Sequence, residues 1–309
     1  MANDAEPYKL YHYNPSFNAA VAFIALFALT TLLHVIQMLK SRSWYFIPFV
    51  IGGIFESLGY TGRAINSKES PKWKTGPYIM QSLLLLLAPA FFAATIYMIL
   101  GRIITLTGGE SRSVIKVTWL TKIFVSGDVL SFLTQSGGGA ILSRAKTSSR
   151  QKLGSWIITA GLGIQVFFFG LFILCAVVFH QRMANHPSRR SKTLDVPWRG
   201  LLWILYVDSG LIMIRSVFRI VEYIQGNDGA LLKRELYLYI FDAGLMFLAM
   251  LILNNWHPSL VLSAGEGDHS LQVVEISRTK EDFASHRIQH GRSDRRHHHS
   301  RSSRVNSAR

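Results

Sequence analysis

Seven charged side chains lie inside long apolar stretches of this sequence. They are Glu56, Asp128, Asp208, Arg215, Arg219, Glu222 and Asp242. A charge at the centre of a membrane helix costs about 2.5 to 3.5 kcal/mol on an insertion scale, so each one needs a partner, water or a task. Five acids against two arginines leave three formal negative charges if all seven ionise. A cationic amphiphile or a proton would offset that excess.

Four of these charges share one face of a helix. At 100° per residue, positions 208, 215, 219 and 222 fall within about 60° of one another and form a polar stripe. Arg219 and Glu222 are three residues apart and can pair along the helix. Arg215 then faces a neighbouring helix, where Glu56, Asp128 and Asp242 are the candidate partners. The sequence therefore predicts a charge network of Asp208, Arg215, Arg219 and Glu222.

A second polar path follows the stretch around Asp128. Asp128, Ser131 and Gln135 share one helical face there. We predict that Glu56, Asp128, Gln135 and Asp242 bind a substrate. The alternative is that the charges form buried salt bridges that hold helices in register, with no substrate at all.

Seven apolar stretches are long enough to place these residues in membrane-spanning helices, since about 20 apolar residues cross roughly 30 Å of hydrocarbon. The predicted spans are Phe17 to Leu39, Trp44 to Ile65, Tyr78 to Leu106, Trp119 to Leu142, Trp156 to Phe179, Leu201 to Tyr223 and Leu236 to Trp256. Several begin or end on Trp or Tyr, which favour the headgroup level. A hydrophobic fraction of 49% and a charged fraction of 17% agree with this assignment. The predicted fold is all-α, a polytopic seven-transmembrane-helix bundle over residues 17–256.

The two ends of the chain differ from this bundle. Residues 1–16 are predicted to be an extracellular N-terminus, and they lack the positive region and cleavage site of a signal peptide. Residues 257–309 are rich in Ser, Arg and His and are predicted to be a disordered basic cytoplasmic tail. The run His297 to His299 fits that composition better than a metal site. Nine of the 33 Lys and Arg lie in the tail, which favours binding to anionic inner-leaflet lipid over nucleic acid.

The positive-inside rule divides the basic residues near the helix ends equally. Eleven lie on each side of the predicted membrane, and only the tail favours a cytoplasmic C-terminus. We therefore expect the N-terminus outside the cell and the protein in the plasma membrane.

The sequence holds no signal for other chemistry. Cys175 is the single cysteine, so no disulfide forms within the chain. No Gly-Lys pair occurs, so there is no P-loop, and zincin, nucleophile-elbow and dinucleotide motifs are absent as well. His34 and His180 lack metal-ligand spacing and are expected to be interfacial residues. We expect neither an enzyme nor a bound cofactor or metal.

Several segments carry a resemblance to a known family. They are the end of the second span with Gly59, Tyr60 and Arg63, the run Leu86 to Ile103, the run Phe124 to Gly139, Gly161 to Gln165, Arg215 to Gly229, Glu235, Tyr239 to Asp242, and His257 with Pro258. In these segments the chain resembles the fungal RTA-like family of lipid-translocating exporters, from about Tyr11 to Pro258.

The resemblance implies a seven-helix fungal membrane protein that moves or exports amphiphiles, such as sphingoid long-chain bases, sterol analogues or other xenobiotics. The first hypothesis is thus a transporter or translocase for a membrane lipid or amphiphilic small molecule, which contributes to resistance against toxic compounds. The second is a seven-transmembrane receptor or membrane stress sensor with an indirect effect on lipid asymmetry. The third is a scaffold held by structural ion pairs.

Overall fold

A computed structural model of the chain describes residues 13–69, 73–143, 145, 147–194, 197–225 and 234–262. Within these ranges the regular structure is helical throughout, so the all-α expectation is confirmed for this part of the chain. The elements are α1 (Phe17–Ser41), η1 (Trp44–Phe46), α2 (Ile47–Lys68), α3 (Thr75–Leu106), η2 (Glu110–Arg112), α4 (Val117–Ser143), α5 (Ser148–Asn185), α6 (Arg189–Thr193), α7 (Trp198–Gln225), α8 (Glu235–Leu238), η3 (Tyr239–Gly244) and α9 (Leu245–Asn255).

Six helical segments in the described part of the chain are long and apolar enough to cross a membrane. They are α1, α3, α4, α5, α7 and the continuous segment Glu235–Leu262. The second predicted span forms helix α2, but α2 does not belong to this group, so the prediction of seven spans is only partly supported. The reason is its composition, because Glu56, Arg63, Asn66 and Lys68 lower its hydropathy. Three of these, Glu56, Arg63 and Asn66, are buried inside the bundle.

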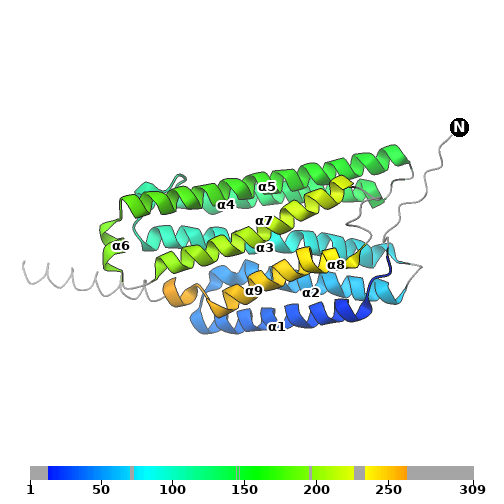
Figure 1. The fold of residues 1–309 in the computed structure, drawn as a ribbon, viewed down its shortest axis with the longest axis horizontal. Coiled ribbons are helices and arrows are strands. Elements are labelled where there is room, and N and C mark those ends of the chain that lie inside the picture. The colour runs from blue at the N-terminus through cyan, green and yellow to red at the C-terminus, as the bar shows by residue number, and fades with distance from the viewer. Residues whose placement is uncertain are drawn as a thin grey trace, which may run out of the picture. The chain divides into compact units, whose positions relative to one another are not determined.

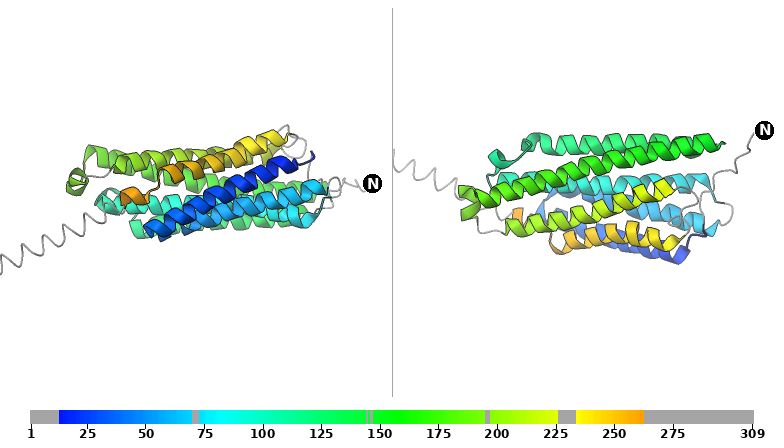
Figure 2. Two further views of the ribbon diagram at one scale, coloured as in Figure 1. Left: turned by 90° about the horizontal axis from the view of Figure 1, so that it is seen from below. Right: turned by 45° about the horizontal axis from the view of Figure 1, so that its top comes forward.

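The helices run alternately up and down in one bundle (Figure 1). Helices α3 and α7 lie in the middle, with α4 and α5 on one side and α1, α2 and α9 on the other. Figure 2 shows α4 and α5 side by side in its second view. Because α3 is central, its side chains dominate the core, and Phe92, Tyr97 and Leu100 are fully buried.

The outward faces of the helices are apolar. Leu29 is 57% exposed, Leu133 61% and Trp203 63%. A water-soluble bundle would turn such side chains inward and polar ones outward. Here the seven charged side chains predicted inside the spans are all buried, which is the arrangement expected in hydrocarbon.

Two helices of the bundle are irregular where polar groups lie nearby. Pro89 stands inside α3 and has no N–H, so it cannot donate to the carbonyl of Leu85 four residues earlier. The seventh predicted span begins as α8, passes through the π-helical turn η3 and continues as α9. Such π-turns are frequent at functional sites, and Asp242 lies in this one.

The C-terminal boundary of the bundle lies beyond the predicted one. Residues 257–262 were assigned to the tail, but Ser259 and Leu262 are 4% and 3% exposed and the segment forms a further helical turn. Residues 263–309, including the histidine run, and residues 1–12 lie outside the described residues.

Candidate functional site

The polar stripe predicted on the sixth span faces the inside of the bundle. Helix α7 places Asp208, Arg215, Arg219 and Glu222 on one side, and all four are less than 10% exposed. The helical periodicity of the sequence therefore identified the inward face correctly. The four charged side chains have different surroundings along the helix.

Arg215 makes two contacts with neighbouring segments. Its Nε lies 2.5 Å from Oδ1 of Asp242 in η3, so the sequence-based expectation of a partner on another helix is confirmed. Its Nη2 donates to the carbonyl of Leu85 at 2.5 Å. That carbonyl is the one that Pro89 leaves without a helical donor. One guanidinium therefore joins the two irregular helices, α3 at its proline and the seventh span at its π-turn.

Arg219 pairs along its own helix. Its Nη1 donates to Oε2 of Glu222 at 2.7 Å, as the three-residue spacing predicts. Glu56 on α2 lies within electrostatic range of Arg215, Arg219 and Asp242. Helices α2 and α7 and the turn η3 thus bring four predicted residues into one cluster.

Three of the five acids form no ion pair with an arginine within the described ranges. Oε1 of Glu56 lacks a hydrogen-bond partner among the described residues, although two arginines lie in its vicinity. Asp128 accepts a hydrogen bond at Oδ2 from the Tyr97 hydroxyl at 3.0 Å, while its Oδ1 is unpaired there. Asp208 is fully buried, and within the described ranges neither of its carboxylate oxygens has a hydrogen-bond partner.

These three acids occupy similar places in their helices. Glu56, Asp128 and Asp208 each lie within four residues of the midpoint of α2, α4 and α7 respectively. Arg215 lies as close to the midpoint of α7 as Asp208 does, whereas Arg219 and Glu222 lie nearer the C-terminal end of this helix. Charges of both signs therefore lie near the helix midpoints, where an uncompensated charge in a membrane is most costly.

The polar path on α4 continues to α5. Ser131 donates to the carbonyl of Gly161 at 2.7 Å, and the Gln135 side-chain amide contacts Ser131 at 2.5 Å and Gln165 at 3.3 Å. The close approach needs a glycine, because a Cβ at Gly161 would stand 3.0 Å from the Ser131 carbonyl oxygen. Asp128, Ser131 and Gln135 share a buried face, as predicted.

The contacts in the structure group the predicted site residues differently from the sequence-based assignment. Asp242 was grouped with the substrate-binding residues, but it is the partner of Arg215. Asp208 was grouped with the charge network, but it has no such partner in the described part of the chain. Asp128 and Gln135 lie on the α4 and α5 side, and no contact among the described residues joins them to the arginines of α7.

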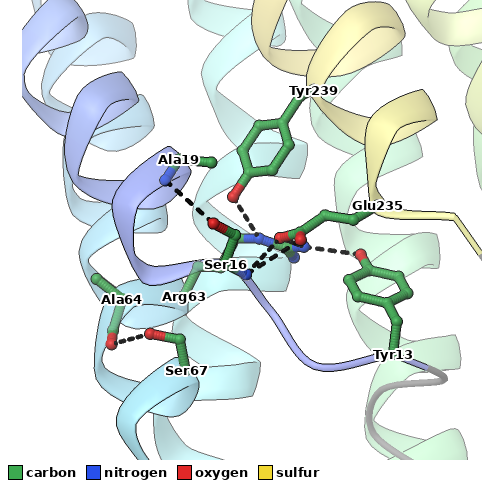
Figure 3. A network of polar contacts seen from close by, with 8 residues as sticks. All are labelled: Tyr13, Ser16, Ala19, Arg63, Ala64, Ser67, Glu235 and Tyr239. Carbon is green, nitrogen blue, oxygen red and sulfur yellow. Dashed lines mark hydrogen bonds and ion pairs between the residues drawn. The ribbon is translucent and has the colours of Figure 1, made fainter.

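A second ion-pair cluster escaped the sequence-based assignment. Arg63 of α2 is fully buried, and its Nη2 donates to Glu235 Oε1 at 2.7 Å and to the Tyr13 hydroxyl at 2.8 Å. Its Nε donates to the Tyr239 hydroxyl at 3.2 Å. Figure 3 shows these side chains meeting from the N-terminal segment, α2 and the start of the seventh span. The sequence-based prediction counted Arg63 only among the basic residues near the helix ends on the outer side, although its place after Gly59 and Tyr60 in a shared motif was a signal.

Glu235 also contacts the start of α1. Both of its carboxylate oxygens accept from the backbone N–H of Ser16, at 2.9 and 3.0 Å. Ser16 is the N-cap of α1, so an acid from the seventh span stabilises the positive end of the first. Burial raises the pKa of the Tyr13 hydroxyl, which therefore stays neutral beside Arg63. We define Arg63, Glu235, Tyr13, Tyr239 and Ser16 as the terminal clamp.

The buried acids of the bundle have three kinds of surroundings. In the described part of the chain, the buried acids pair with arginines, face a tyrosine hydroxyl or stand alone. Uncompensated carboxylates in a low-dielectric interior attract a cation or take up a proton. Long apolar helices around a charged interior define the class, which is a multi-pass integral membrane protein.

Sequence comparison gives the family of this membrane protein. The RTA1-like protein family matches residues 49–264, so the chain belongs to that family. The chain is 39% identical to Protein RTA1 of Saccharomyces cerevisiae, over 92% of this chain and 99% of the relative. It is 37% identical to Protoporphyrin uptake protein 1 of the same species, over 81% and 92%. Identity to Sphingoid long-chain base transporter RSB1 of Saccharomyces cerevisiae is 25%, over 79% and 72%. No solved structure matches the chain.

Proposed function

We propose that the protein transports lipid-like amphiphiles across the membrane. The observation that carries the proposal is the set of three buried acids, Glu56, Asp128 and Asp208, that form no ion pair with an arginine in the part of the chain that the structure describes. A relative in the same family is named for the transport of sphingoid long-chain bases. These are cationic amphiphiles with one long chain, so their charge complements the interior.

In this proposal the ion pairs and the unpaired acids have different roles. Glu56 and Asp128 would contact the cationic head of the substrate, with Gln135 as a polar neighbour on the same path. Arg215 with Asp242 and Arg219 with Glu222 would hold the helices or change partners during the cycle. A buried pair costs desolvation free energy, so it gives less stability than its distance suggests and can serve as a switch.

The proposal includes seven membrane crossings with α2 as the second. Helix α2 has 22 residues and is therefore about 33 Å long, which matches the roughly 30 Å hydrocarbon core. Its charged residues Glu56 and Arg63 are buried in the bundle, and its glycines face α3 or, at Gly53, α1 and α9, so the low hydropathy of α2 does not expose these two charges to lipid. An odd number of crossings puts the ends on opposite sides. We place the N-terminus outside and the C-terminus in the cytoplasm, in the plasma membrane.

The test is transport by the purified protein in liposomes. The assay follows a sphingoid base, a sterol analogue and a protoporphyrin, each with and without a proton gradient. Asp128→Asn keeps an oxygen for the Tyr97 hydroxyl, so this variant should fold and fail to transport. Glu69→Gln is the control, because Glu69 pairs with Lys74 at the surface.

Each outcome decides between the three hypotheses. Movement of lipid by the protein alone, lost in Asp128→Asn only, supports transport. Wild-type protein that moves none of the amphiphiles, and binds a cytoplasmic partner in response to one of them, would support the receptor or stress sensor instead. Charge variants that lose abundance and activity together would support the scaffold.

A further inference from the structure

A groove of about 330 Å³ opens on the outer surface of the bundle, between α4 and α5. Helix α4 supplies Trp119, Lys122, Ile123, Gly127 and Leu130, and α5 supplies Phe168. It lies outside the charged interior described above. None of its residues belongs to the ion pairs or to the terminal clamp.

The walls of the groove suit a hydrocarbon chain. Trp119 is 57% exposed and Leu130 51% exposed, so both face the lipid. Ser126 also lines the groove, but its hydroxyl donates to the backbone carbonyl of Lys122 at 2.7 Å and is therefore already satisfied. Gly127 and Phe168 form the floor, since a side chain at Gly127 would meet the Phe168 ring, with 2.6 Å from its Cβ to Cδ1.

The length of the groove matches one leaflet. Trp119 lies in the first turn of α4, and Leu130 follows eleven residues later. At about 1.5 Å per residue this is roughly 16 Å, half of a 30 Å hydrocarbon core. The groove therefore reaches from the headgroup level to the depth of the bilayer centre.

The charge of the groove lies at its headgroup end. Among the described residues that line the groove, Lys122 alone is charged, and its Nζ lies 5.5 Å from the centroid of the Trp119 ring. The segment leading to it, residues 107–122, holds Arg112, Lys116 and Lys122 against Glu110 alone. A tryptophan and a lysine side by side at this level are typical of a lipid headgroup contact.

We propose that this groove binds one acyl chain of an anionic glycerophospholipid, with the lipid phosphate at Lys122. A cationic amphiphile would bring its head to a lysine and is disfavoured, so the groove differs in charge from the acidic interior. With the N-terminus outside, the groove opens to the cytoplasmic leaflet, where anionic lipids are concentrated.

The bound lipid would act on helix α4 from outside. Gly127 faces the groove and the next residue, Asp128, faces Tyr97 in the interior. An acyl chain against Gly127 and Phe168 holds α4 on α5 at the level of this acid. The groove would thus hold a structural lipid that is not transported. This inference does not depend on the proposed transport activity.

The test is native mass spectrometry of the purified full chain, titrated with phosphatidylserine or phosphatidylcholine. The wild type should retain phosphatidylserine in preference to phosphatidylcholine. Lys122→Ala should lower the affinity for phosphatidylserine about fivefold, which is the contribution of one lysine near an anionic surface. Lys122→Arg should restore the affinity. Lys40→Ala is the matched control, because Lys40 is an exposed lysine in the last turn of α1 at the same end of the bundle.

A second variant tests the apolar walls. Leu130→Trp fills the groove and should lower the binding of both lipids. The proposal is overturned if Lys122→Ala and Lys40→Ala have the same effect, or if phosphatidylcholine binds the wild type as well as phosphatidylserine does. Leu130→Trp without effect on either lipid would also overturn it.

Discussion

Replacing Arg215 with methionine removes two contacts of one guanidinium. Asp242 then keeps a buried charge without its partner, and the Leu85 carbonyl loses the donor that stands in for Pro89. Methionine conserves most of the apolar volume of the side chain. The loss therefore reports on charge and hydrogen bonding, with little contribution from a cavity.

The ion pair should dominate the size of the effect. Breaking a buried pair by removing one partner costs about 3 to 5 kcal/mol, because the other charge stays buried. The hydrogen bond to Leu85 adds about 0.6 kcal/mol, the average for polar contacts between membrane helices. The total of about 4 to 6 kcal/mol corresponds to a fall in Tm of about 10 °C, at roughly 2 °C per kcal/mol for a chain of this size.

The assay is thermal unfolding in detergent, followed by tryptophan fluorescence. Arg215→Met should lower the apparent Tm by about 10 °C, and Arg215→Met with Asp242→Leu should regain most of it, because no charge is left unpaired. Adding Pro89→Ala to Arg215→Met should regain a little, because alanine returns an N–H to the Leu85 carbonyl. Arg199→Met, an exposed arginine on the same helix, is the control. A loss below about 2 °C, or a double variant no better than the single one, refutes the reasoning.

Three further predictions concern other parts of the bundle. Glu235→Gln weakens the terminal clamp and should speed hydrogen exchange at residues 13–19, whereas Glu69→Gln should not; equal exchange in both would refute the clamp. Gly161→Ala should lower Tm, because the added Cβ would contact Gln135 and Ser131. Gly163→Ala places its Cβ in open space and should leave Tm unchanged, so equal effects of the two variants would contradict this packing. Asp208→Leu should leave Tm unchanged or raise it, because it removes a buried carboxyl that lacks a partner in the described ranges. A large fall in Tm would contradict this and would show that Asp208 has a partner.

The helices and their inward faces could be predicted because hydrophobic periodicity determines both. The stripe from 208 to 222 and the face of Asp128, Ser131 and Gln135 are buried as the 3.6-residue period requires. Helix ends were less accurate. Helix α5 begins eight residues before the predicted Trp156 and ends six after Phe179, because a helix can continue past the hydrocarbon while hydropathy reports only the part inside.

The pairing of charges could not be predicted, because it depends on which helices become neighbours. Arg215 had three candidate acids in the sequence, and the packing of η3 beside α7 selects Asp242. The same packing leaves Asp208 without a hydrogen-bond partner among the residues that the structure describes. Arg63 was counted among the basic residues near the helix ends on the outer side because a charge at a helix end is usually solvated, whereas Glu235, Tyr13 and Tyr239 contact it here.

The central claim is that uncompensated acids inside the bundle receive the cationic head of an amphiphile. The most direct measurement compares a sphingoid base with its N-acetylated, uncharged counterpart in the same proteoliposomes. The wild type should move the charged base several times faster than the acetylated one, and Asp128→Asn should abolish that difference. Equal movement of both compounds by the wild type would contradict the claim.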